Sequence, residues 1–103
     1  MIITTTATIP EKKIKEILGI VRGNTIRARH IGRDIMAGLK TIIGGEIKSY
    51  TKMISDARDE AYSRMEEEAK SLNADAIVNV RFVTAEVMQG AAEVLAYGTA
   101  VKL

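Results

Sequence analysis

Apolar and polar residues alternate with a period of two near the start of the chain. Residues 2–9 are almost all β-branched, which favours a strand, and Pro10 ends this run. Residues 13–28 alternate in the same way, but Gly19 and Gly23 interrupt the alternation. Because a glycine inside a strand pattern often marks a bulge, this stretch predicts one long strand or two strands joined at a bulge.

Two further alternating runs, residues 75–88 and 91–103, lie on either side of Gln89-Gly90 and predict a β-hairpin. Apolar residues occupy both alternating faces of each run. A sheet that helices cover on one side only is polar on its other face. We therefore expect a second cover for this sheet, and we expect it to be another copy of the chain.

Between these strands the apolar period lengthens to three or four residues, which predicts helices. The first helix covers residues 31–43, and Gly44-Gly45 ends it in a left-handed cap. Gly38 inside this helix weakens it by about 1 kcal/mol relative to alanine. We therefore expect a neighbouring element to approach closely at Gly38.

The longer helix covers residues 49–72, with Ser49 as its N-terminal cap and Asn73 in the left-handed conformation that follows it. Small residues on its apolar stripe would let it lie close to a sheet. The stripe consists of Tyr50, Met53, Ile54, Ala57, Ala61, Met65, Ala69 and Leu72. On the polar face, two pairs have the i,i+4 spacing and order that stabilise a helix, Glu60–Arg64 and Glu66–Lys70.

The order ββααββ predicts a single α+β domain over residues 1–103, with two layers formed by an antiparallel sheet and two helices. The chain has no cysteine and one histidine, which excludes disulfides and thiolate chemistry. No apolar run approaches the roughly 20 residues of a membrane span. The first ten residues lack the features of a signal peptide, so a cytoplasmic protein is expected.

Charge is divided unevenly between the two halves of the chain. Residues 1–48 carry a net charge of +5 and residues 49–103 a net charge of −3. The basic half can attract anions, or it can complement the acidic half within one subunit or between subunits. Arg22, Arg27, Arg29 and Arg33, with Asn24, precede and enter the first predicted helix, where free N–H groups and guanidinium groups favour a small anion. We place the candidate anion site at Arg27, Arg29 and Arg33. The alternative is that these arginines pair between subunits with the acids of the long helix. No aromatic residues are interleaved with the basic ones, so nucleic-acid binding is not expected.

An ordered set of short motifs resembles the YbjQ-like family of small bacterial and archaeal proteins. The motifs span nearly the whole chain and comprise Arg33-Asp34, Gly38, Ile43-Gly44-Gly45, Ser49-Tyr50, Ala57-Arg58, Glu60-Ala61, Asn73-Ala74-Asp75-Ala76 and Gly98-Thr99-Ala100-Val101. Asn73 stands where the family usually has glycine, and both residues tolerate the left-handed conformation.

The resemblance implies a dodecin-like subunit that forms a ring-shaped homopentamer. It also implies structural roles for the residues of the family pattern, which are Asp34, Gly38, Gly44, Gly45, Tyr50, Asp75 and Gly98. The family carries a heavy-metal-binding label. Soft metals prefer thiolate and imidazole ligands, and this chain has no cysteine and one histidine, so we predict no metal site.

The sequence contains no visible nucleophile–base pair and no phosphate-binding fingerprint, so we expect a non-catalytic protein whose role is assembly or the binding of a small ligand such as an anion. No cofactor can be named.

Asp56, Asp59 and Glu60 share a helix face that would suit a hard cation, but we interpret it as a solvated face. We interpret His30 as a strand–helix boundary residue. Two alternatives stay open: a metal-binding protein, as the family label suggests, and an enzyme with sites at subunit junctions.

Overall fold

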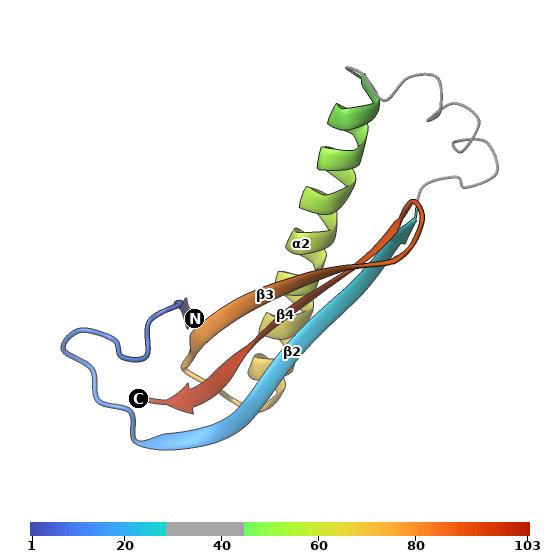
Figure 1. Cartoon of the computed structure of the whole chain (residues 1–103). Helices are drawn as coiled ribbons and strands as arrows, with labels where there is room; N and C mark the ends of the chain where they lie inside the picture. Colours follow the sequence, from blue (N-terminus) through green and yellow to red (C-terminus); the bar gives the residue numbers. More distant parts are fainter. Residues whose placement is uncertain (29–44) are drawn as a thin grey trace.

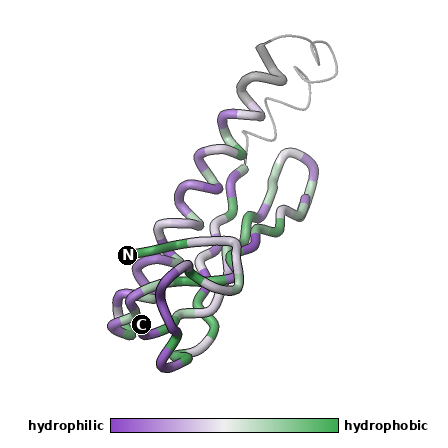
Figure 2. The backbone as a smooth tube through the Cα atoms, turned by 90° about the vertical axis from the view of Figure 1, so that its left-hand side faces the viewer, coloured by the Kyte–Doolittle hydropathy of each residue, from purple (hydrophilic) through white to green (hydrophobic). Residues whose placement is uncertain are grey.

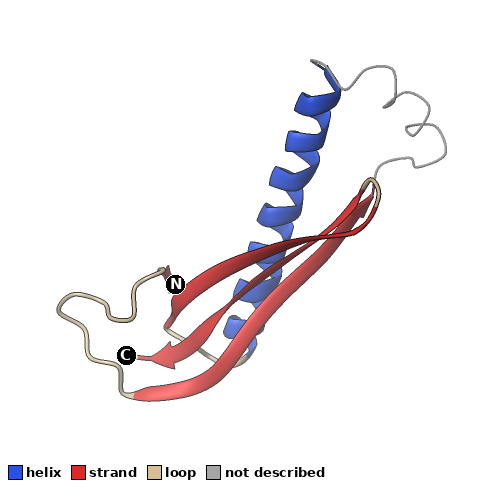
Figure 3. Ribbon diagram, in the orientation of Figure 1, coloured by secondary structure: helices blue, strands red, loops and turns tan. Residues whose placement is uncertain are grey.

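The computed structural model describes residues 1–28 and 45–103, which form four strands and one long helix (Figures 1 and 3). The elements are β1 (Ile2–Ile3), β2 (Glu16–Ala28), α2 (Gly45–Ser71), β3 (Ala76–Met88) and β4 (Ala91–Lys102). The strands form one sheet in the order β1-β3-β4-β2, and α2 lies against one of its faces. The predicted α+β class is confirmed, and the helix predicted over residues 31–43 lies outside the described residues.

Strands β2, β3 and β4 form an antiparallel unit. Strands β3 and β4 meet at the predicted hairpin, where Gly90 has a φ of 78°. Strand β2 pairs with β4 along its whole length, from Glu16 opposite Lys102 to Ala28 opposite Ala91. The predicted bulge is present between Ile17 and Gly19, and Gly19 has a φ of 129°, a conformation that favours glycine.

The N-terminal segment departs from the prediction. Its regular strand ends after Ile3 rather than at residue 9, and it pairs parallel to β3, so the sheet is mixed and not antiparallel. The segment continues beside β3 through single hydrogen bonds, in which the N–H of Thr4 donates to Ile77 O and the N–H of Asn79 donates to Thr6 O. The irregularity has a local cause, because Asn79 has a φ of 55° and the register of β3 shifts there.

The predicted apolar stripe of the long helix forms the core against the sheet. Its central members are fully buried: Ala57, Ala61, Met65 and Ala69. They pack with residues of three strands: Val21, Ile77, Val80, Val94, Ala96 and Ala100. Asn73 ends the helix with a φ of 60°, as predicted. The helix begins at Gly45, so Gly45 is not a left-handed cap and Ser49 is not the N-terminal cap.

Gly23 lies at a very close contact between the helix and the sheet. A Cβ atom at this position would overlap the carbonyl oxygen of Ala61 and the backbone nitrogen of Met65, and would lie 2.7 Å from the Cβ of Arg64. The sequence pattern suggested a bulge at Gly23, but the strand is regular there. The glycine instead lets the backbone of α2 pack directly on β2.

The opposite face of the sheet, which we call the outer face, is covered at one end by the N-terminal segment. There, Ala76, Val78 and Val101 are buried beneath the N-terminal segment, with Ile9 and Ile14 packed against them. This internal cover accounts for part of the second apolar face noted in the sequence.

Beyond that end, the hairpin half of β3 and β4, from Arg81 to Tyr97, and the part of β2 that pairs with it form an extension, which we call the arm. Every residue of β3 from Arg81 to Met88 is exposed. Figures 1 and 2 show the hairpin end diverging from the N-terminal half of α2. The radius of gyration is 17.2 Å, well above the roughly 13 Å of a compact domain of this length. The arm therefore carries much of its apolar surface in contact with solvent.

Candidate functional site

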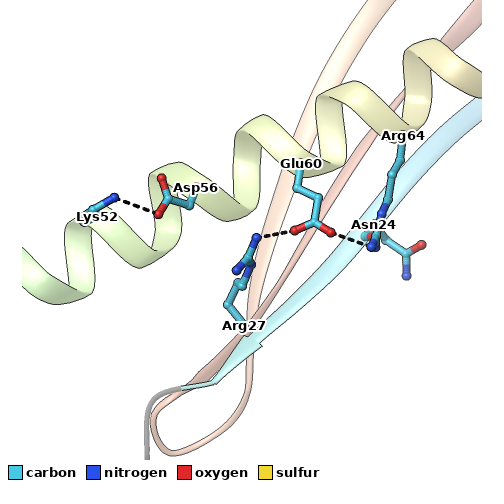
Figure 4. Close-up of polar contacts among 6 residues, drawn as sticks. All are labelled: Asn24, Arg27, Lys52, Asp56, Glu60 and Arg64. Carbon is cyan, nitrogen blue, oxygen red and sulfur yellow. Dashed lines mark hydrogen bonds and ion pairs between the residues drawn. The ribbon is translucent and has the colours of Figure 1, made fainter.

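A cluster of charges joins α2 to β2 beside Gly23, and we call it the Glu60 cluster (Figure 4). Glu60 on α2 lies between two guanidinium groups, accepting a hydrogen bond from Nη2 of Arg27 and forming an ion pair with Arg64. Arg64 also donates from Nη1 to the backbone oxygen of Asn24, at 2.6 Å. Both carboxylate oxygens of Glu60 are thus engaged by cations from two different elements.

Arg27 is one of the three arginines of the predicted anion site. In the structure it pairs with Glu60, an acid of the long helix, but within one chain rather than between subunits, which was the alternative stated for these arginines. Arg29 and Arg33 lie outside the described residues, as do His30, Asp34, Gly38 and Gly44. Anion binding at this end of β2 stays a prediction.

The contact between Arg64 and Asn24 has a second consequence. Among the described strands, β2 is at the edge of the sheet and pairs with β4. An edge strand offers unpaired backbone groups to other chains. Arg64 donates a hydrogen bond to one of the carbonyl groups of this strand.

The Glu60–Arg64 pair was predicted from its spacing. The contact of Arg64 with Asn24 has no signal in the sequence, because the two residues are 40 positions apart. The predicted Glu66–Lys70 pair is not among the ion pairs of the described residues.

Asp75 ties the C-terminus to the turn that follows α2. Its Oδ2 accepts the backbone N–H of Leu103 at 2.9 Å, and its Oδ1 lies 3.5 Å from Nζ of Lys102. Lys102 also donates to the backbone oxygen of Asn73, at 2.8 Å. The hydrogen bond from the backbone N–H of Leu103 lowers the pKa of Asp75 below its ordinary value of 3.8, against an opposing effect of desolvation, and the charge of Lys102 lowers the pKa further.

Two other residues of the family pattern have visible packing environments. Gly98 on β4 faces the irregular part of β3, where a Cβ atom would lie 2.7 Å from Cγ2 of Ile77 and 3.0 Å from the backbone oxygen of Val78. Gly98 therefore permits a close approach of the two strands. Tyr50 lies near the start of α2 and is half-buried.

A shallow pocket of about 270 Å³ lies on the outer face and is lined by Arg22, Asn24, Glu93 and Leu95. It combines a cation, an anion, an amide and an apolar side chain on two adjacent strands. Arg22 and Asn24 belong to the basic cluster that precedes the first predicted helix, but the sequence does not connect them with Glu93 or Leu95. The strand register, which brings the four side chains together, cannot be read from local spacing.

The residues that the structure describes do not fit a heavy-metal site. They contain no group of three or more histidine, cysteine, aspartate or glutamate side chains that could hold a metal ion. The whole chain lacks cysteine, the ligand that soft metals prefer. In the same part of the chain, no helix is long and apolar enough to cross a membrane.

Comparisons with known proteins agree on the family. Residues 1–103 match a family described as "Putative heavy-metal-binding". A UPF0145 protein from Archaeoglobus fulgidus is 64% identical over 100% of this chain and 95% of its own length. A UPF0145 protein from Vibrio parahaemolyticus is 57% identical over 100% of this chain and 98% of its own length.

The fold also has a counterpart among solved structures. A protein of unknown function of the DUF74 family from Pediococcus pentosaceus has a TM-score of 0.70, with 20% sequence identity over 100% of this chain and 97% of that one. None of these names assigns a reaction. The family expected from the sequence motifs is confirmed: the chain belongs to the YbjQ family, whose members include the UPF0145 proteins.

Proposed function

We propose that this chain is a non-catalytic subunit of a homo-oligomer, arranged as the ring of five copies that the resemblance implies, whose role is assembly or the binding of a small anion. The observation that carries the proposal is the exposed arm. From Arg81 to Met88, β3 is exposed on both faces, although Phe82, Val83, Val87 and Met88 are apolar. Contiguous apolar surface of this kind marks a protein interface.

The edge of the arm supports self-association as well. Strand β1 and the segment after it accompany β3 as far as Val80, and from Arg81 onward no other described segment pairs with this edge of β3. Heterologous contacts between an edge on one copy and a different surface on the next generate rings when the rotation closes. The arm thus offers both apolar area and backbone groups to a neighbouring copy.

Light scattering coupled to size exclusion tests the assembly. We expect a mass that is a multiple of five chains of 11.2 kDa each at micromolar concentration. A mass of 11.2 kDa would overturn the proposal, and an assembly that is not a multiple of five would overturn the ring of five alone.

The anion role is tested by thermal unfolding in phosphate and in sulfate. We expect either ion to raise Tm, and high sodium chloride to weaken this effect because it screens the arginines. In Arg29→Ala and Arg33→Ala, an intact oligomer that no longer responds to the anions supports the site. Loss of the oligomer supports a structural role for the arginines, and an unchanged response excludes this location.

Metal binding, the function in the family description, is the second candidate. We expect any bound metal to be weakly held and hard, such as magnesium or calcium, because the chain has no cysteine and one histidine. Elemental analysis after dialysis against a chelator separates the two candidates. Stoichiometric zinc or copper that survives dialysis would favour metal binding over the assembly proposal.

A further inference from the structure

The outer face of the sheet carries exposed apolar residues next to the charged pocket. On β2, Ile20 and Ile26 are 74% and 59% exposed, and Arg22 and Asn24 alternate with them on the same face. Leu95 on the neighbouring strand lies opposite Asn24. Together these residues form a mixed apolar and polar surface on the side of the sheet away from α2.

The charges on this surface are placed at opposite ends. Glu93 is opposite Ile26, and Arg22 is four residues before Ile26 on β2, so about 13 Å along the strands separates the cation from the anion. Asn24 and Leu95 lie midway between them. Neither Arg22 nor Glu93 forms an ion pair with another residue that the structure describes.

Such a surface is complementary to a copy of itself. If a second copy is turned about a twofold axis that runs across the strands through Asn24 and Leu95, its Glu93 comes to lie over Tyr97, beside Arg22 on the adjacent strand. By the same rotation, its Arg22 comes to lie over Ile26, beside Glu93. The same rotation places Asn24 on Asn24 and Leu95 on Leu95. An interface in which one patch meets its own copy in this way is isologous.

We propose that the outer face of the sheet, centred on Asn24 and Leu95, packs against the same face of a second copy, with Arg22 of each copy beside Glu93 of the other. The contact buries Ile20 and Ile26 and fills the pocket. This proposal rests on the proposed self-association of the chain and adds to it. A twofold contact joins two copies, or two rings of copies, into a pair.

Charge reversal tests the pairing. Arg22→Glu and Glu93→Arg each place like charges beside one another, so light scattering should show half the wild-type mass for either variant. The double variant restores opposite charges across the twofold axis and should recover the full mass. Glu68→Arg, on an exposed position of α2, is the matched control and should leave the mass unchanged. Circular dichroism confirms that each variant is folded.

A cysteine at the axis gives an independent measurement, because the chain has no cysteine of its own. Because facing sheets lie about 10 Å apart, too far for a direct disulfide, Asn24→Cys should be joined between copies by a short bis-maleimide crosslinker, seen as a covalent dimer on a denaturing gel. Glu67→Cys on the exposed side of α2 should not be joined. Wild-type mass in both reversal variants with no dimer from Asn24→Cys would overturn the proposed face while leaving the oligomer intact. A monomeric wild-type protein would instead overturn the proposed function.

Discussion

Gly23 illustrates how much one residue contributes to the contact between helix and sheet. A methyl group there would overlap the backbone of α2 at Ala61 and Met65. We expect Gly23→Ala to lower the free energy of unfolding by about 1–3 kcal/mol, since overpacking a well-filled contact has a cost of that size. Urea unfolding measures it, with the exposed Ser63→Ala as a control expected to stay within about 0.5 kcal/mol of wild type. Wild-type stability in Gly23→Ala would show that the helix can move away without cost.

Asp75 predicts a dependence of stability on pH. Its pKa in the folded chain is lowered below 3.8 by the N–H of Leu103 and by Lys102. The carboxylate therefore stabilises the fold above about pH 3.8, and this contribution is lost as the pH falls through the lowered pKa. Asp75→Asn should reduce Tm at pH 7, and the difference from wild type should disappear near pH 2.

The control for this measurement is Asp59→Asn, at an exposed position of α2 that has no ion pair with any described residue. It should change Tm little at pH 7. A Tm difference between Asp75→Asn and wild type that persists unchanged at pH 2 would contradict the assignment.

Sequence reasoning identified some glycine and asparagine roles and missed others. The bulge at Gly19 and the left-handed Asn73 were predictable because each depends on local backbone conformation. Gly23 and Gly98 are needed for close contacts with segments far away in the chain. A sequence shows that such a glycine interrupts a strand pattern, but not which element approaches it.

At the scale of elements, the Glu60 cluster joins α2 to β2 through the Arg27–Glu60 ion pair and the hydrogen bond from Arg64 to Asn24. Glu60→Gln leaves the side chain in place but removes the charge shared by Arg27 and Arg64. We expect a loss of about 1 kcal/mol in the free energy of unfolding, because all three side chains are partly exposed. The loss should shrink in 1 M salt.

Glu67→Gln, on the exposed side of the same helix, is the matched control for Glu60→Gln and should have little effect. Equal losses in the two variants would show that only the total charge of the helix matters. Equilibrium unfolding in urea at low and high salt provides both comparisons.

The elements themselves were predicted with uneven success. The hairpin, the long strand and the buried stripe of α2 follow from periodicity and are present. The first strand is shorter than its β-branched run suggests because Asn79 interrupts the regular pairing of β3. The prediction that Ser49 caps the helix was wrong, because the helix already begins at Gly45. A residue that can cap a helix does not by itself show where the helix begins.

At the scale of the whole molecule, the exposed arm predicts which substitutions weaken the association of subunits. Replacing Phe82 and Met88 by serine removes apolar area, worth about 1.5–3 kcal/mol for each side chain if it is fully buried in the oligomer. We expect the double variant to have a smaller mass than wild type by light scattering. Glu86→Gln, on the same exposed strand, should keep the wild-type mass, and an unchanged double variant would place the subunit contacts elsewhere.

The exposed part of β3 also has a consequence for rates of opening. The amides of α2 near Ala69 and of β3 at Ile77 belong to the common buried cluster, so their exchange with deuterated solvent requires unfolding of the domain. The amides of Val83 to Val87 lie in the part of β3 in which every residue is exposed, so we expect brief local fraying to exchange them. This part of β3 should therefore open far more often than the buried cluster unfolds, which lets it adjust its shape to a neighbouring molecule while the cluster stays folded.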